Sequence, residues 1–101
     1  MHLIQVLLPL RDNAGEAFPQ DLFAEVLREL SDRFGGSTAY TRSPAEGIWR
    51  TGDADHRDDI IVVEVMADTL DRKWWTAYRK TLEDRFRQQE LVVRVQATEL
   101  I

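Results

Sequence analysis

Two oppositely charged residues stand inside strand-like segments that are otherwise apolar. Glu64 lies in the run of residues 59–66, and Arg94 lies in the alternating run of residues 91–98. A partly buried carboxylate beside an arginine has a perturbed pKa, and such pairs are common where small molecules bind. The same pattern is typical of a structural ion pair at a dimer interface, and we favour that second interpretation.

Three further side chains complete the candidate ligand site. Gln5 is the polar interruption of an apolar run, and Gln96 follows Arg94 at the spacing that places both on one face of a strand. Trp49 stands beside a break at residues 44–47, which contains Pro and Gly, and can edge a cleft there. The expected ligand-binding residues are Gln5, Trp49, Glu64, Arg94 and Gln96.

The other reactive side chains indicate no catalytic or metal centre. His56 lies among carboxylates in residues 53–59, but the segment lacks the spacing of an EF-hand loop. We therefore expect a solvated, mobile hairpin tip there. The chain has no cysteine, which excludes a disulfide scaffold, thiolate metal sites and a cysteine nucleophile. No serine lies in a nucleophile-elbow motif. We expect no cofactor and no metal.

Composition and charge restrict the class of partner. The chain has 101 residues, 44% hydrophobic and 31% charged, with a net charge of −5. This composition is typical of one globular domain, residues 1–101. The acidic balance disfavours nucleic acid, because phosphates repel it. The apolar residues at the start are too few for a signal peptide or a membrane helix. We expect a cytoplasmic protein with neither nucleic acid nor membrane as a partner.

Hydrophobic periodicity predicts the elements that must position these residues. A first helix begins near Pro19 and is stopped by Gly35 and Gly36. A second helix is expected to be capped by Asp68, with Asp71 completing a capping box. Its buried stripe is expected at Leu70, Trp74, Tyr78, Leu82 and Phe86, widened by Trp75. Strands are expected at residues 2–10, 37–51 with an interruption, 59–66 and 91–98.

The order of these elements is strand, helix, strand, strand, helix, strand. It matches the α+β ferredoxin-like βαββαβ fold, a four-stranded antiparallel sheet with two helices on one face. A doubly wound parallel sheet would need a crossover helix between the two middle strands, and the sequence contains none.

Several segments resemble a small family of bacterial proteins of similar length. They are residues 8–13, 45–50, 58–65, 74–75, 78–79 and 86–88. The resemblance covers almost the whole chain and implies a ferredoxin-like fold, without any chemistry. The wider ferredoxin-like group includes dimers that pack sheet on sheet, among them cofactor-free monooxygenases. That wider likeness is one of architecture, and fold does not carry function.

Strand alternation leaves one sheet face without a helix. We expect this open face to hold Leu3, Gln5, Leu7, Ile60, Val62, Glu64, Met66, Val92, Arg94 and Gln96. The helix side takes the alternate residues of the same strands, such as Ile4, Val6, Val63 and Val65. An apolar open face of this kind usually marks an interface, and a symmetric homodimer is the simplest way to cover it.

Two functional hypotheses follow. The first is a small cytoplasmic homodimeric binding or interaction module that uses the open sheet face, with a small molecule as its candidate ligand. The alternative is a cofactor-independent small-molecule enzyme of the dimeric α+β-barrel type, with a pocket near Glu64 and Arg94.

Overall fold

The computed structural model of the chain describes residues 1–42 and 60–101. Its elements, in chain order, are β1 (His2–Pro9), α1 (Gln20–Phe34), β2 (Thr38–Arg42), β3 (Ile60–Ala67), α2 (Arg72–Arg85) and β4 (Val92–Ala97). The expected α+β ferredoxin-like order is confirmed. Trp49, His56 and the break at residues 44–47 lie outside the described residues.

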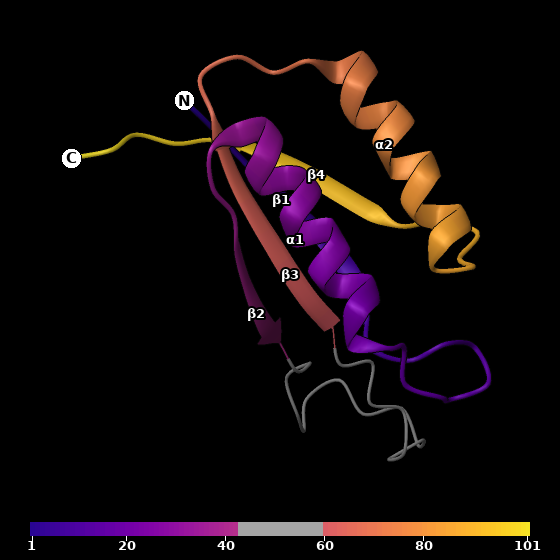
Figure 1. Cartoon of the computed structure of the whole chain (residues 1–101). Helices are drawn as coiled ribbons and strands as arrows, with labels where there is room; N and C mark the ends of the chain where they lie inside the picture. Colours follow the sequence, from indigo (N-terminus) through magenta and orange to yellow (C-terminus); the bar gives the residue numbers. More distant parts are fainter. Residues whose placement is uncertain (43–59) are drawn as a thin grey trace, which may run out of the picture.

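The four strands form one antiparallel sheet in the order β2-β3-β1-β4. The first strand of the chain is therefore central, and the last strand pairs with it at the edge. Figure 1 shows α1 running across β3 and β1, and α2 lying beside β4. In the register, Gln5 is opposite Glu64 on one side and opposite Arg94 on the other.

The core lies between the helices and one face of the sheet. Ile4, Val6 and Leu8 of β1 are fully buried there, and Val63 and Val65 of β3 almost fully. This is the side that the alternation of β1 and β3 predicted. Burying these branched side chains removes about 25 cal/mol of unfavourable hydration per Å² of apolar surface, which fixes the face on which the helices pack.

The first helix begins and ends close to the predicted positions. Pro19 occupies the N-cap position, and Leu22 donates its backbone N–H to the Pro19 carbonyl oxygen at 3.1 Å. Gly35 ends the helix in a left-handed conformation with φ 81°, donating to the Ser31 carbonyl oxygen at 2.8 Å. A residue with a Cβ would be strained at this φ, so glycine terminates the helix at low cost.

The second helix differs from the prediction in its cap and in its buried face. Asp71, and not Asp68, is the N-cap residue, and its carboxylate accepts from the Trp74 backbone N–H at 3.1 Å. Trp75 is buried, whereas Trp74 is only partly buried. The buried stripe therefore runs through Trp75, Tyr78, Leu82 and Phe86.

Two burial expectations for the strands were wrong. Val62 lies on the open face by register, opposite Leu7 and Tyr40, yet it is fully buried. Val95 of β4 lies on the helix side but is 38% exposed. A groove of about 130 Å³ separates α2 from β4 at this point, because the helix lies beside the edge strand without covering it.

Candidate functional site

A row of polar side chains crosses the open face of the sheet, with one member from each strand. We call Tyr40 (β2), Glu64 (β3), Gln5 (β1) and Arg94 (β4) the open-face row. Glu64, Gln5 and Arg94 are direct neighbours in the register of three adjacent strands. Tyr40 is aligned with Val62 and reaches Glu64 diagonally, as a long side chain can on a pleated surface.

Hydrogen bonds join the open-face row from end to end. The Gln5 amide nitrogen donates to Glu64 Oε2 at 2.6 Å, and its amide oxygen accepts from Arg94 Nε at 2.7 Å. The Tyr40 hydroxyl donates to the same Glu64 oxygen at 3.1 Å. The amide of Gln5 therefore presents its donor to the anion and its acceptor to the cation. Charge-assisted bonds of this kind are stronger than neutral ones.

The row keeps unused hydrogen-bonding capacity. Glu64 Oε1 and the two terminal guanidinium nitrogens of Arg94 have no hydrogen bond or ion pair with any residue that the structure describes. Glu64 and Gln5 are half-buried, and Arg94 is exposed. The row can therefore bind a second polar group without breaking its internal bonds.

Apolar side chains flank the open-face row. Val62, Leu7 and Val92 lie opposite one another on one side, and Leu3 and Met66 on the other. Met66 is 48% exposed and Val92 is 50% exposed, so part of this apolar surface is in contact with water. The open face thus combines a polar centre with an apolar border.

The predicted site residues are only partly brought together. Gln5, Glu64 and Arg94 meet, with Gln5 between the two charges. Gln96 lies on the same face, opposite Leu3, and no hydrogen bond joins its side chain to the described part of the row. Trp49 lies outside the described residues. Sequence reasoning missed Tyr40. The alternation of residues in its segment indicated a strand, but it did not show that the Tyr40 hydroxyl contacts Glu64 of β3.

A cavity of about 470 Å³ lies on the opposite side of the sheet, beneath α1. Its described lining comes from α1, β2, β3 and the segment between β1 and α1, and it is mostly apolar. Neither Glu64 nor Arg94 is among those lining residues. Glu64 and Arg94 therefore do not belong to the cavity beneath α1.

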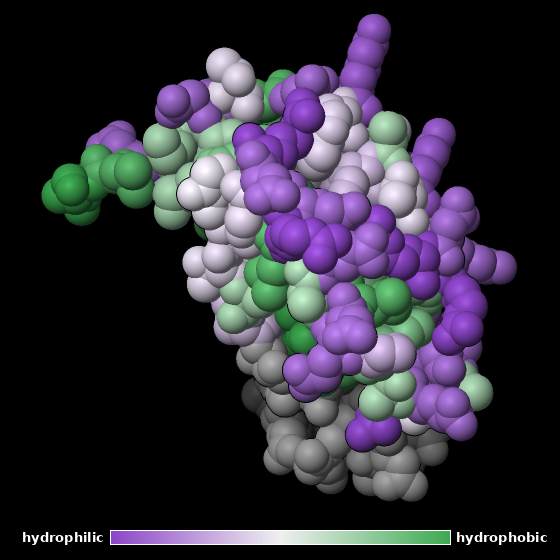
Figure 2. Space-filling view, viewed as in Figure 1, coloured by the Kyte–Doolittle hydropathy of each residue, from purple (hydrophilic) through white to green (hydrophobic). Residues whose placement is uncertain are grey.

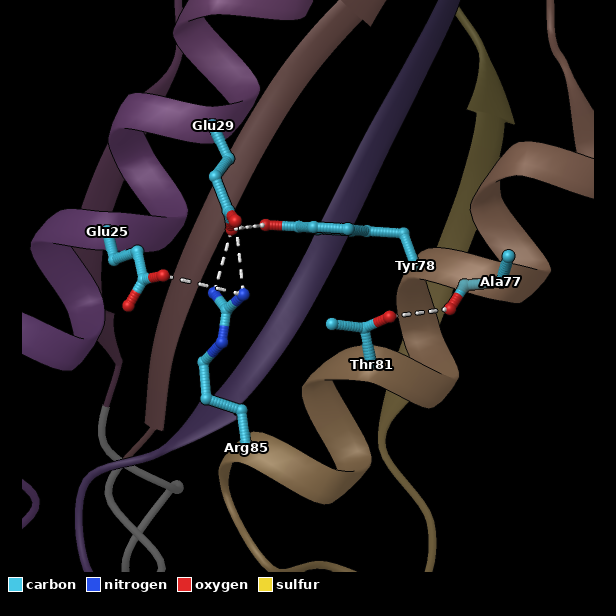
Figure 3. A network of polar contacts seen from close by, with 6 residues as sticks. All are labelled: Glu25, Glu29, Ala77, Tyr78, Thr81 and Arg85. Atoms are coloured by element: carbon cyan, nitrogen blue, oxygen red, sulfur yellow. Dashed lines mark hydrogen bonds and ion pairs between the residues drawn. The ribbon is translucent and has the colours of Figure 1, made fainter.

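A second polar network joins the two helices (Figure 3). Arg85 of α2 donates to both carboxylate oxygens of Glu29 of α1, at 2.7 and 3.0 Å, and the Tyr78 hydroxyl donates to Glu29 Oε1 at 2.9 Å. Glu25 adds an ion pair to Arg85 at 3.7 Å. The bidentate geometry fixes the two helices relative to one another.

The protonation states of this network are set by its own contacts. The hydrogen bonds from Arg85 lower the pKa of Glu29, and burial opposes that shift. Burial raises the pKa of Tyr78 well above its ordinary value, and the bond to the Glu29 carboxylate raises it further. The hydrogen bonds to Glu29 also raise the pKa of Arg85. All three groups keep their neutral-pH protonation states, so the network is a structural clamp and offers no base.

The described residues contain no cluster of three or more side chains that could hold a metal ion. No helix in the described ranges 1–42 and 60–101 has the length and apolar character needed to cross a membrane.

Comparison with known proteins identifies a likeness of fold. No protein-family model matches the chain, and no curated protein matches it. A phage SAM lyase, solved in complex with S-methyl-5'-thioadenosine, superposes with a TM-score of 0.62 at 12% sequence identity. The alignment covers 94% of this chain and 79% of the lyase chain. At this identity the likeness shows a shared architecture.

Proposed function

We propose that this chain is a cytoplasmic homodimeric binding module whose two open sheet faces pack against each other, with the open-face row at the centre of the interface. The observation that carries the proposal is the row itself. It places an anion and a cation on either side of Gln5, both with unused hydrogen-bonding capacity facing away from the helices.

The charges of the open-face row are complementary to those of a second copy. A two-fold axis running along β1, between two face-to-face sheets, carries the row of one copy onto the other in reverse order. Glu64 of each copy then faces Arg94 of the other. A two-fold axis running across the strands would instead place Glu64 opposite Glu64, and the like charges would repel. The proposed dimer therefore has its axis along β1.

The apolar border favours the same arrangement. Packed sheets lie about 10 Å apart, so side chains from both faces interdigitate between them. Met66 and Val92, which are about half exposed, would be covered at that distance. A standard interface removes about 800 Å² from each partner, which an open face of four strands can supply.

The likeness of fold to the phage SAM lyase supports small-molecule binding as the role of the proposed module. In that phage SAM lyase the same architecture holds S-methyl-5'-thioadenosine. The support is by analogy of fold and does not transfer any residue of that site. In this chain, the unused oxygen of Glu64 and the guanidinium of Arg94 are the groups available for a polar ligand between the two sheets.

Charge reversal tests the proposed dimer. Light scattering of the unaltered chain is expected to give twice the chain mass. Glu64→Lys and Arg94→Glu should each shift the mass toward the monomer, because each places like charges opposite one another. The double variant restores opposite charges and should recover the dimer. Mixed with the unaltered chain, the double variant should not form mixed dimers, since its charges match only its own kind.

Lys80→Glu is the matched control, because Lys80 is an exposed residue of α2 away from the open face. This variant should remain dimeric. A monomeric unaltered chain would refute the proposed function. A dimer that tolerates Glu64→Lys would show that another surface is used. Val62→Lys is not a suitable probe, because Val62 is buried within the chain and its replacement would test folding.

The alternative function is a cofactor-independent small-molecule enzyme at the same face. It is favoured by one observation: Glu64 is a half-buried carboxylate with one oxygen unused, close to an arginine that can hold an anionic group. Such a pair can accept a proton and stabilise a developing negative charge. Incubation with SAM, followed by chromatography for S-methyl-5'-thioadenosine, tests this alternative, with Glu64→Gln as the inactive variant.

A further inference from the structure

The cavity beneath α1 is lined almost entirely by apolar side chains. Nine of its eleven described lining residues are apolar, and Arg11 and Gln20 are the exceptions. Its volume of about 470 Å³ lies within the range of small-molecule sites. Figure 2 shows hydrophobic surface below the hydrophilic outer face of α1. Several lining residues are exposed, so the cavity opens to solvent, and an apolar ligand would gain free energy by removing its apolar lining from water.

Small residues create this space. Ala24 of α1 and Ala39 of β2 both line the cavity, where longer side chains would fill the gap between helix and sheet. The floor is formed by Ile61 and Val63 of β3, and Phe23 of α1 forms part of the wall. The cavity is therefore a property of side-chain size at the helix–sheet contact.

The loop before α1 holds a cation at the rim. Arg11 Nη1 donates to the Gly15 carbonyl oxygen at 3.1 Å, and Arg11 forms an isolated β-bridge with Ala17. Asp12 Oδ1 accepts the backbone N–H groups of Ala14 and Glu16, each at 2.9 Å. These bonds order the loop, so Arg11 is positioned before any ligand arrives, which lowers the entropic cost of binding.

Arg11 keeps an unneutralised charge. The neighbouring carboxylate, Asp12, forms its ion pair with Arg87 at 3.5 Å. Within the described residues no carboxylate lies within ion-pair distance of Arg11. A guanidinium without an anion, at the rim of an open apolar cavity, fits a molecule with one carboxylate and a hydrocarbon body.

We propose that the cavity beneath α1 binds a small aliphatic carboxylate, with its hydrocarbon chain inside the cavity and its carboxylate on the Arg11 guanidinium. This site is distinct from the open-face row, and it does not depend on the proposed dimer.

Octanoate and octanol, which share a chain length and differ in charge, are the probes. Binding is followed by backbone amide chemical shifts, and the largest shifts are expected in α1 near Ala24. Arg11→Gln should weaken octanoate binding about tenfold, the effect of losing one charge-assisted hydrogen bond. The same substitution should leave octanol binding unchanged. Arg28→Gln, an exposed arginine of α1 outside the cavity lining, should change neither.

Filling the cavity is the second arm. Ala24→Phe should abolish binding of both probes. Ala39→Leu fills the space from the sheet side and gives an independent check if Ala24→Phe unfolds the chain, as seen by circular dichroism. The proposal is overturned if octanoate fails to bind, if its shifts lie on the open face, if both filled variants still bind it, or if Arg11→Gln leaves its affinity unchanged.

Discussion

Gln5 links the two charges of the open-face row through the two ends of one amide. Its nitrogen donates to Glu64 and its oxygen accepts from Arg94, so Glu64 and Arg94 interact without touching. A carboxylate at position 5 would repel Glu64, and an apolar residue would leave both charges without this partner. The chemistry of the row therefore depends on a side chain that carries no charge.

A double-mutant cycle measures this link. Glu64→Gln and Arg94→Met are each expected to cost about 1 kcal/mol in the free energy of unfolding, because solvent screens these partly exposed charges and reduces their hydrogen bonds to the value of an ordinary one. Their combined cost should fall short of the sum, with a coupling on the order of 0.5–1 kcal/mol. At a protein concentration where light scattering shows a monomer, the coupling should vanish when Gln5 is replaced by Leu, because within one chain the link passes through Gln5. Urea denaturation at one fixed protein concentration provides the measurement.

Gln96 supplies the control for this cycle. It lies two residues beyond Arg94 on the same face, without a hydrogen bond to the row among the described residues. A cycle between Glu64→Gln and Gln96→Leu should be additive. Coupling between Glu64 and Arg94 that survives in the monomeric Gln5→Leu background would show that the two charges interact directly within one chain.

Tyr78 carries the clearest pH dependence among the described residues. Burial and the bond to Glu29 raise its pKa in the folded chain. Above pH of about 10, the ordinary tyrosine pKa, the unfolded chain releases the phenolic proton while the folded chain retains it. The unfolded state then binds fewer protons, so the free energy of unfolding falls as the pH rises.

Tyr78→Phe separates this contribution from other alkaline effects. At neutral pH the variant should lose about 1 kcal/mol, the value of one buried hydrogen bond. Between pH 9 and 11, as the pH passes the ordinary value near 10, its free energy of unfolding should fall less steeply than that of the unaltered chain. Urea unfolding across this range tests the prediction, which equal slopes for the two proteins would contradict.

At the scale of elements, the start of α2 depends on Asp71. Its carboxylate accepts the Trp74 backbone N–H, which otherwise has no partner in the first turn. Asp71→Ala should cost about 1 kcal/mol of stability, whereas Asp68→Ala should stay within about 0.5 kcal/mol. Asp71→Asn retains an acceptor and should lie between the two. Thermal unfolding ranks the variants, and a larger loss for Asp68→Ala would refute the assignment of the cap.

In the same helix, hydrophobic periodicity did not determine which aspartate is the N-cap or which tryptophan is buried. Asp68 and Asp71 both precede apolar residues at capping distance, and Trp74 and Trp75 are adjacent. A shift of one residue rotates a helix by about 100°, and both tryptophans fall near the apolar stripe. Trp75 is buried in the core, while Trp74 stacks on Tyr78 and lies under Arg33, whose guanidinium carbon is 4.2 Å from its ring centroid. Packing against α1 decides between them.

For the strands, alternation was sufficient to assign faces but not burial. It placed Gln5, Glu64 and Arg94 on one face, and in the ferredoxin-like strand order Gln5 stands between the two charges. The hydrogen bond from the Tyr40 hydroxyl to Glu64 could not be foreseen, because it depends on the twist of β2 and on the χ angles of the tyrosine side chain. The cavity beneath α1 also escaped prediction, since Ala24 and Ala39 are distant in sequence.

At the scale of the whole molecule, the two faces of the sheet differ in what packs against them. One face carries the core and holds the helices, which are clamped to each other by Arg85 and Glu29. The other face carries the open-face row and an exposed apolar border. With a net charge of −5 on each chain, two copies repel at long range. In the proposed dimer the attraction comes from short-range contacts, so we expect salt to assist association by screening this long-range repulsion.

The central place of β1 has a consequence for synthesis on the ribosome. Among these elements this strand is made before its two neighbours, β3 and β4, which follow residues 59 and 91. Gln5 and its hydrogen-bond partner Arg94 are 89 positions apart in the sequence. Until β4 emerges, one edge of an apolar strand has no partner, and such an edge can pair with other nascent chains. We therefore expect the unpaired edge of β1 to stay open to pairing with other chains until β4 has been made.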